Sequence, residues 1–200
     1  MTATRIPPIE VTGVFGALAK RMSKRMLGTV PKSLGTMWHN KPVLKAGVAM
    51  SRRTRTWREC ERDLKSYAHM AVASLIGCSA CLDFGYYRAR NEGLDLTKAQ
   101  QIPRWRESDV FTPLEREVLE YAEAMSQTPP TVTDEMSARL LEQLGAPALV
   151  ELSAYIGLAN EMTRTNVALG VEADGLAEAC GLAPMAQRSV GSGSPASSAS

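Results

Sequence analysis

The sequence predicts an all-α protein. Apolar residues recur at intervals of three and four along most of its 200 residues, as they do on the buried face of a helix. No stretch alternates apolar and polar residues between turn signals, so we expect no β-sheet. The chain divides into a basic amphipathic helix in residues 1–29, a helical domain in residues 30–184, and a Gly/Ser/Ala tail in residues 185–200 that we expect to be disordered.

The first predicted helix is basic and amphipathic. Val14, Leu18 and Met22 recur every fourth residue and lie opposite a face of lysines and arginines. Gly28 suits the end of this helix, because glycine readily adopts the left-handed conformation that follows many helices.

Two segments lead from this helix into the core. The sequence KSLGTMWHNKPVLKAGVAM predicts one or two short helices, interrupted at Gly35 and Pro42. From about residue 56 to residue 76, apolar residues again step by three and four, which predicts a long helix. Gly77 suits its C-terminal cap.

A helical hairpin follows, because only a short turn separates this long helix from the next. The second helix spans about residues 78–91, opens with Cys78 and Cys81, and ends at Gly93. The sequence LTKAQQI then predicts a short helix with Thr97 as its cap.

The last predicted helices carry clear start and stop signals. Thr112 and Glu115 form a capping box at the start of one helix. The next helix begins after Thr133, whose hydroxyl suits an N-cap, and ends at Gly145. A final long helix follows and ends at Gly170.

Charge is unevenly distributed along the chain. Residues 1–58 hold 12 Lys and Arg against one acidic residue, a net +11, whereas the remainder holds 11 Lys and Arg against 20 Asp and Glu, a net −9. Such a basic segment can bind nucleic acid or membranes, but no aromatic stacking series or nucleic-acid motif accompanies it. We therefore expect no nucleic-acid or membrane partner, and expect the basic segment to dock on the acidic body, within or between subunits.

The sequence carries no transmembrane signal. No apolar run approaches the roughly 18 residues that a membrane-spanning helix needs, and the N-terminus lacks the charge order and cleavage site of a secretory signal. The four cysteines are also too few and too unevenly spaced for a secreted disulfide scaffold. We expect a cytoplasmic protein.

The pair Cys78 and Cys81 is the motif that can carry chemistry. Helix positions three apart lie roughly 5–6 Å apart at Cβ, so the two thiols can close a disulfide. The positive end of the helix dipole lowers the pKa of a cysteine in the first turn. Two alternatives are a pair of buried core residues and half of a zinc site. The remaining cysteines and histidines do not have metal-site spacing, so we expect no metal; they are Cys60, Cys180, His39 and His69.

The overall pattern resembles a known family. A long helix, GCSAC at the next helix start, TPLEREVLEYAEAM and a C-terminal helix ending in LGV are similar to the carboxymuconolactone decarboxylase family over roughly residues 30–172. The resemblance is nearest to the alkyl hydroperoxidase D-like (AhpD-like) branch. It implies a helical bundle with the CxxC at the start of a core helix, commonly assembled into homotrimers or homohexamers. It also implies peroxidase or disulfide-reductase chemistry without a bound cofactor.

The resemblance also implies roles for the two cysteines. Cys81 corresponds to the thiolate that attacks the peroxide, and Cys78 to the partner that resolves the sulfenic acid as a disulfide. The helix-terminus argument alone favours Cys78 as the more acidic thiol, so the order of the two stays open.

The proton relay of the AhpD-like branch is missing at its usual places. The branch carries a glutamate twelve residues before the CxxC and a histidine four residues after it, where this chain has Ser66 and Gly85. Neither serine nor glycine titrates near neutrality. The candidates for assisting residues are Ser66 itself, His69 one turn along the same helix, and Arg88 one turn beyond Gly85.

Three functions are compatible with the sequence. The first is a thiol-dependent peroxidase or disulfide oxidoreductase that cycles Cys78 and Cys81, with a hydroperoxide or other small molecule as substrate. An external dithiol, from a thioredoxin-like protein or a lipoyl group, would restore the thiols. The second is a binding or assembly scaffold with little turnover. The third is a cofactor-free lyase acting on a small carboxylic acid.

Overall fold

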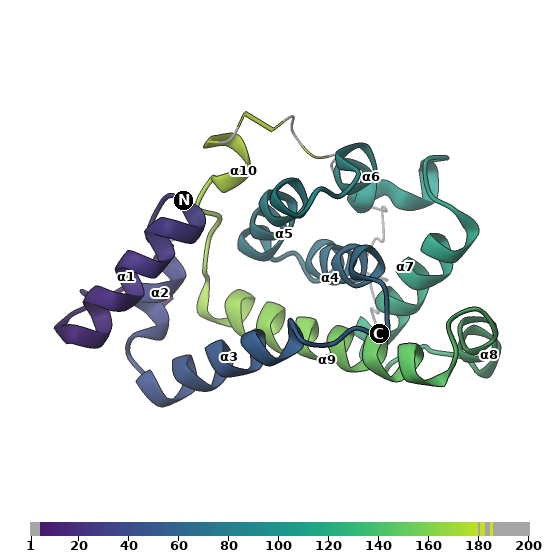
Figure 1. Ribbon diagram of the computed structural model, residues 1–200, viewed down its shortest axis with the longest axis horizontal. Coiled ribbons are helices and arrows are strands. Elements are labelled where there is room, and N and C mark those ends of the chain that lie inside the picture. Colours follow the sequence, from purple (N-terminus) through teal and green to yellow (C-terminus); the bar gives the residue numbers. More distant parts are fainter. Residues whose placement is uncertain (1–4, 180, 183–184, 186–200) are drawn as a thin grey trace, which may run out of the picture.

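The computed structural model describes residues 5–179, 181, 182 and 185, and every regular element among them is a helix. The predicted all-α fold class is therefore confirmed for the described residues. The central helix is α4 (Arg62–Ile76), and α5 (Ser79–Glu92), α7 (Pro113–Ser126) and α9 (Ala146–Leu169) pack around it (Figure 1). The remaining elements are α1 (Gly13–Leu27), α2 (Lys32–Met37), α3 (Lys41–Thr54), α6 (Leu96–Gln101), the 3-10 helix η1 (Ile102–Glu107), α8 (Asp134–Leu144) and α10 (Leu176–Ala179).

The core is built around α4, which is buried along most of its length. Small residues on α4, among them Ala68 and Ala71, are fully buried and let α7 and α9 approach closely. Tyr67 and Met70 fill the space between, and apolar side chains of α7 and α9 complete the cluster. Helix α4 therefore fixes the positions of the helices that surround it.

The predicted hairpin of α4 and α5 is confirmed. Gly77 caps α4 with a φ of +83°, a left-handed conformation that glycine adopts without strain. Cys78 is the N-cap of α5, and Gly93 ends α5 in the same left-handed conformation as Gly77. The two cysteines thus lie at the start of a core helix, as expected.

Several predicted boundaries were wrong. Gly35 does not interrupt a helix but lies inside α2, where an ideal β-carbon would approach Cβ of Pro8 to 2.8 Å. Pro42 lies in the first turn of α3, where its missing N–H is not needed. Asp95, not Thr97, caps α6 through its carboxylate. The sequence reading also missed η1 and α10, and the predicted tail of residues 185–200 lies outside the described residues, except for Met185.

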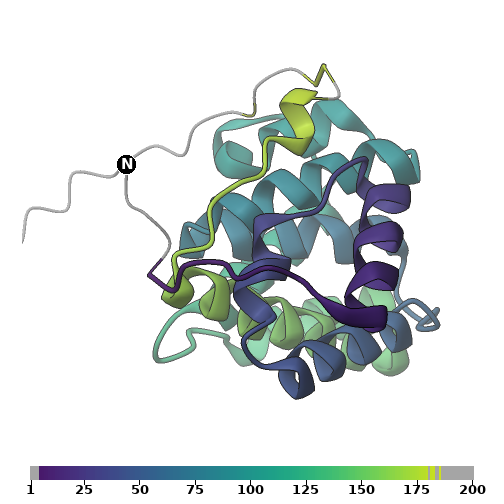
Figure 2. The same cartoon turned by 90° about the vertical axis from the view of Figure 1, so that its left-hand side faces the viewer.

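Helices α1, α2 and α3, which we call the N-terminal arm, lie beside the bundle (Figure 2). Trp38 is buried and stacks on Phe15, with ring centroids 5.4 Å apart. The guanidinium of Arg5 donates hydrogen bonds to backbone carbonyls of the last turns of α9, and the N–H of Lys32 donates to Asp174. These bonds tie the arm and the segment that precedes it to the last turns of α9 and to the segment that follows α9. No helix in the described part of the chain combines the length and apolar character needed to cross a membrane.

Candidate active site

Cys78 and Cys81 are joined by a disulfide, with their Cα atoms 5.3 Å apart. Both are buried. The sulfur of Cys78 also caps α5, because it accepts a hydrogen bond from the N–H of Cys81 at 3.1 Å. A thiolate at position 78 is therefore stabilised by a backbone amide and by the positive end of α5.

Cys81 lines a pocket of about 180 Å³, and Cys78 does not. Phe84 from α5, Met162 from α9 and Leu176 from α10 form apolar parts of the wall. The junction between α1 and α2 of the arm contributes Leu27, Pro31 and Ser33. A small molecule in this pocket therefore meets the sulfur of Cys81 first.

Asn166 contacts the same sulfur from α9. Its Nδ2 donates a hydrogen bond to Sγ of Cys81 at 3.4 Å, and its side chain lines the pocket. The sequence reading missed this residue. Its position in the sequence could have indicated it, because Asn166 is a polar residue at the next position of the helical stripe that contains the buried residues Ile156, Ala159 and Thr163.

His69 supplies an imidazole next to Gly85. An ideal β-carbon at Gly85 would lie 3.4 Å from Nδ1 of His69 and 2.9 Å from Cγ of Met70, so α4 fills the space that a side chain at position 85 would need. Gly85 lies one turn after Cys81 on α5, and His69 and Cys81 both line the pocket. The candidate assisting role of His69 is therefore compatible with its placement.

The protonation state of His69 follows from its burial. Its side chain is 7% exposed, and Nε2 has no hydrogen-bond partner among the described residues. Burial, with a smaller contribution from the positive charge of Arg88, lowers the pKa of His69 to about 4. The ring is therefore neutral at pH 7 and can accept a proton.

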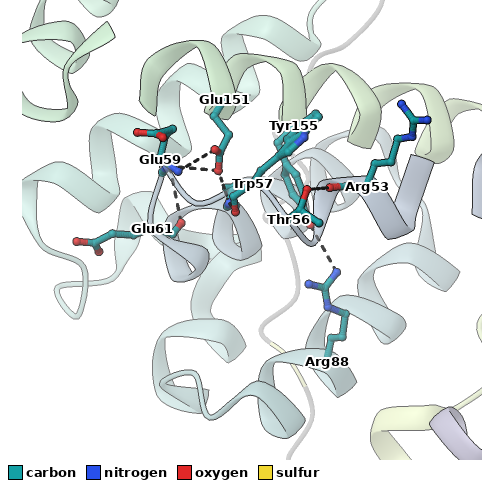
Figure 3. A network of polar contacts seen from close by, with 10 residues as sticks. Arg53, Thr56, Trp57, Glu59, Glu61, Arg88, Glu151 and Tyr155 are labelled. Carbon is teal, nitrogen blue, oxygen red and sulfur yellow. Dashed lines mark hydrogen bonds and ion pairs between the residues drawn. The ribbon is translucent and has the colours of Figure 1, made fainter. Parts of the chain in front are cut away.

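The other two assisting candidates lie elsewhere. Arg88 does not turn toward Cys81. Its guanidinium donates to Glu92 at 2.8 Å. It also reaches the hydroxyl of Tyr155 on α9 at 3.5 Å (Figure 3). Ser66 is half-buried on α4 and does not line the pocket. Of the three, only His69 is brought to the pocket.

A buried ion pair anchors the segment that precedes α4. Lys65 of α4 pairs with Glu151 of α9, and both side chains are buried. Glu151 also accepts a hydrogen bond from the N–H group of Glu59 (Figure 3). It accepts another from the N–H group of Cys60, and Lys65 donates to the carbonyl of Trp57 at 3.0 Å. These bonds hold residues 57–60 out of the helix, which explains why α4 begins at Arg62 and not near residue 56.

The remaining candidate ligands that the structure describes do not form a metal site. Burial raises the pKa of Cys60 to about 11, so this thiol stays protonated at pH 7. Nε2 of His39 lies 3.0 Å from the carbonyl of Pro7. Cys180 lies outside the described residues, and the described residues contain no group of three or more His, Cys, Asp or Glu placed to hold a metal ion.

These features define a helical protein whose central hairpin carries a cysteine pair and presents one of the two cysteines, Cys81, to a small pocket. Residues 43–124, which include both cysteines and His69, match the model of the Carboxymuconolactone decarboxylase family. The Uncharacterized protein YnjA of Escherichia coli (strain K12) is 37% identical over 125 residues, which cover 60% of this chain and 69% of YnjA. The chain belongs to the carboxymuconolactone decarboxylase family.

Solved structures share the fold. The debrominase Bmp8, a variant of which was solved in complex with 2,3,4-tribromopyrrole, has a TM-score of 0.75 at 20% identity, covering 87% of this chain and 94% of Bmp8. The alkylhydroperoxidase AhpD core of an uncharacterized peroxidase-related protein from Ralstonia eutropha JMP134 has a TM-score of 0.75 at 16% identity, covering 88% of this chain and 95% of that one. The predicted AhpD-like fold is therefore confirmed.

Proposed function

We propose that this protein is a thiol-dependent oxidoreductase that reduces a small hydroperoxide by cycling Cys78 and Cys81 between dithiol and disulfide. One observation carries the proposal. Cys81 lines a pocket together with the neutral imidazole of His69, and its sulfur is bonded to that of Cys78. The pocket, a nucleophile, a proton acceptor and a resolving thiol are thus in one place.

The first step oxidises Cys81. Its thiolate attacks the terminal oxygen of the hydroperoxide, the O–O bond breaks, and the electron pair leaves with the alkoxide. The products are a sulfenic acid on Cys81 and, after proton transfer, an alcohol. As the sulfur attacks, His69 accepts the thiol proton and passes it to the departing alkoxide, so the imidazolium that its buried site disfavours does not persist. Asn166 stabilises the thiolate through its hydrogen bond to Sγ.

The second step closes the disulfide. The thiolate of Cys78 attacks Sγ of Cys81, the S–O bond breaks, and the hydroxide leaves as water after protonation. One hydroperoxide and two thiols have then become one alcohol, one water and one disulfide. An external dithiol, from a thioredoxin-like protein or a lipoyl group, attacks Sγ of Cys81 through the pocket. Cys78 is the better leaving group because it caps α5.

The test uses the reduced protein and tert-butyl hydroperoxide. We expect the disulfide to form much faster than free cysteine is oxidised under the same conditions. Free-thiol assay and intact mass measure its formation. Cys78→Ser should stop at a sulfenic acid on Cys81 that dimedone traps, whereas Cys81→Ser should lose rapid oxidation. Oxidation of the unaltered protein no faster than that of free cysteine would favour the scaffold alternative.

A second candidate is reductive removal of a halogen from a small aromatic ring. It is favoured by the apolar part of the pocket wall beside Cys81 and by the fold shared with the debrominase Bmp8. The dithiol would supply the same two electrons, so that a carbon–bromine bond becomes a carbon–hydrogen bond and bromide leaves as the disulfide forms. Incubation of the reduced protein with 2,3,4-tribromopyrrole should then release bromide in step with thiol loss. Thiol loss without bromide release would exclude this candidate.

A further inference from the structure

One wall of the pocket of Cys81 is a short segment that follows α9. This C-terminal strap, residues 171–179, runs between the arm and α5 and ends in α10 (Figure 1). Its Asp174 and Leu176 line the pocket. Apart from the junction between α1 and α2, the other walls belong to α4, α5 and α9, which are core helices of 14 to 24 residues. The strap therefore costs less to move than these helices.

Two carboxylates fasten the strap, one to each of its neighbours. Asp83 of α5 accepts hydrogen bonds from the N–H groups of Leu176 and Ala177, both at 2.9 Å. Asp174 of the strap accepts one from the N–H of Lys32 at the start of α2, at 3.0 Å. The strap is thus bound both to the helix that carries the cysteine pair and to the arm.

The carboxylate of Asp83 stabilises α10. This helix has four residues, and an isolated helix of that length is not stable in water. The first N–H groups of a helix have no partner within it, and Asp83 supplies one for both Leu176 and Ala177. Loss of such a cap typically shifts the equilibrium of a helix by about fivefold. Without Asp83, we expect α10 to unwind and the strap to leave the pocket more often.

The pocket beside the strap is small. It measures about 180 Å³, whereas pockets for drug-sized ligands measure roughly 300–1,000 Å³. Cys81 is 4% exposed, so a reagent must enter the pocket to reach its sulfur. A molecule of the size of tert-butyl hydroperoxide has room there, but the surface of a protein that carries a dithiol does not. Disulfide exchange with a protein therefore requires a wall of the pocket to move.

We infer that the C-terminal strap is a gate, latched by Asp83, that sets the size of the molecules that reach Cys81. The closed strap admits small hydroperoxides and excludes bulky ones. The open strap lets a protein dithiol attack Sγ of Cys81. The inference takes its purpose from the proposed redox function, but access to the sulfur can be measured without turnover. Asp83 is a positioning residue in this scheme, because it acts through the strap.

Alkylation of Cys81 by two maleimides of different size measures this access. Cys78→Ser with Cys180→Ser keeps the cap of α5, because serine is a good N-cap, and the remaining Cys60 is buried and protonated. N-ethylmaleimide and N-(1-pyrenyl)maleimide carry the same reactive group. Each rate is divided by that of the same reagent with free cysteine, and peptide mass mapping identifies the modified thiol. We expect the pyrenyl reagent to be much the slower of the two at Cys81.

Ala177→Pro opens the latch without a change of charge. Proline removes the N–H that donates to Asp83, and it is tolerated in the first turn of a helix. We expect the rate with N-(1-pyrenyl)maleimide to rise about fivefold and that with N-ethylmaleimide to stay within about twofold. The matched control is Ala177→Ser, which keeps the N–H and should leave both rates as they are. Circular dichroism of each variant checks that the helices are retained.

Asp83→Asn tests the latch from its other side. It weakens both hydrogen bonds and also removes a charge near Cys81, which changes both rates alike, so the ratio of the two rates is the readout. This ratio should rise in Asp83→Asn and stay unchanged in Asp109→Asn, because Asp109 is exposed and does not line the pocket. In the chain with all four cysteines, thioredoxin should reduce the disulfide faster in Ala177→Pro, whereas the rate with dithiothreitol should stay the same.

The outcomes separate the gate from the proposed function. Equal normalised rates of the two maleimides with the strap intact, or a ratio that both Ala177→Pro and Asp83→Asn leave unchanged, would overturn the gate. Slow oxidation by tert-butyl hydroperoxide, together with a ratio that rises as expected, would support the gate and contradict the proposed function. Rapid oxidation with an unchanged ratio would do the reverse.

Discussion

Replacing Asn166 tests the assignment of Cys81 as the attacking thiol. Asn166→Leu removes the hydrogen bond from Nδ2 to Sγ while keeping a side chain of similar size. Hydrogen bonds to charged groups contribute about 1.5–3 kcal/mol, and the low end suits a 3.4 Å bond to sulfur. Because 1.36 kcal/mol corresponds to one pKa unit, the pKa of Cys81 should rise by about one unit.

The oxidation rate should change less than the thiolate population. A rise of one unit lowers the thiolate fraction about tenfold when the thiol is mostly protonated. A more basic thiolate is also more nucleophilic, by a factor of roughly three per unit. The net result is oxidation by tert-butyl hydroperoxide that is about three- to fourfold slower at pH 7. At high pH, where both thiols are fully ionised, the variant should instead react about threefold faster than the unaltered protein.

The assay needs a background with one titrating thiol. Cys78→Ser with Cys180→Ser leaves Cys81 and Cys60, and the pKa of about 11 keeps Cys60 protonated over most of the range. Thiolate absorbance against pH then reports Cys81. Asn160→Leu is the matched control, because Asn160 lies on the same helix and donates to Ser126 instead of a sulfur. A pKa of Cys81 that is unchanged in Asn166→Leu, or equally raised in Asn160→Leu, would refute the reasoning.

Three further predictions concern stability and selectivity. His69 has a pKa of about 4 when folded and 6.5 when exposed, so the unfolded chain binds more protons between these values, and stability should fall by about 3 kcal/mol as pH drops from 6.5 to 4. The free energy of unfolding of His69→Gln should therefore fall less between pH 6.5 and pH 4 than that of the unaltered protein. An unchanged dependence of this free energy on pH would contradict the prediction. Glu151→Leu leaves Lys65 buried without its partner, so urea denaturation should show a loss of about 3–5 kcal/mol, whereas Glu172→Leu, on an exposed side chain, should change little. Asp83 and Asp174 line the pocket and no Lys or Arg does, so a carboxylate-bearing hydroperoxide should oxidise the thiols more slowly than its neutral analogue. Asp174→Asn should reduce this difference between the two hydroperoxides, and a difference that stays the same would contradict a contribution from Asp174.

Local signals in the sequence were sufficient for much of the fold. The helices that begin after Thr112 and Thr133 were predicted from their caps, since a hydroxyl that accepts a backbone N–H acts within three residues. The hairpin at Gly77 was predicted from an equally local signal, because a glycine in the left-handed conformation ends a helix. The start of α4 could not be predicted in this way, because the carboxylate of Glu151 that binds the amide of Glu59 is 92 residues away in sequence.

The residues of the candidate site also divide into those that local sequence signals predicted and those whose contacts depend on the packing of distant helices. Spacing alone indicated Cys78 and Cys81, and helical periodicity placed His69 on a stripe with Ser66. Asn166 was not predicted, because its bond to Cys81 joins residues 85 apart and depends on how α9 packs against α5. Arg88, one turn beyond Gly85, was one candidate for assisting the thiols, but the hydroxyl of Tyr155 and the carboxylate of Glu92 bind its guanidinium instead.

The absence of a side chain at Gly85 and the presence of His69 have one physical explanation. The pattern that this chain resembles places a histidine on the cysteine helix, whereas here the imidazole comes from the neighbouring helix and occupies the space above a glycine. If the ring serves the same reaction, its position matters more than its helix of origin. His69→Ala should then slow oxidation of Cys81 by about a hundredfold, at the low end for loss of general acid–base catalysis.

Returning the imidazole to position 85 tests this explanation. His69→Ala clears the space beside the β-carbon of residue 85, so His69→Ala with Gly85→His should recover part of the oxidation rate. The matched control, His69→Ala with Gly85→Ala, fills the space without an imidazole and should stay slow. Both double variants must displace Cγ of Met70, which lies 2.9 Å from the new β-carbon, so overpacking should cost each of them about 1–3 kcal/mol of stability. Equal rates in the two double variants would show that the ring of His69 fills space and carries no proton.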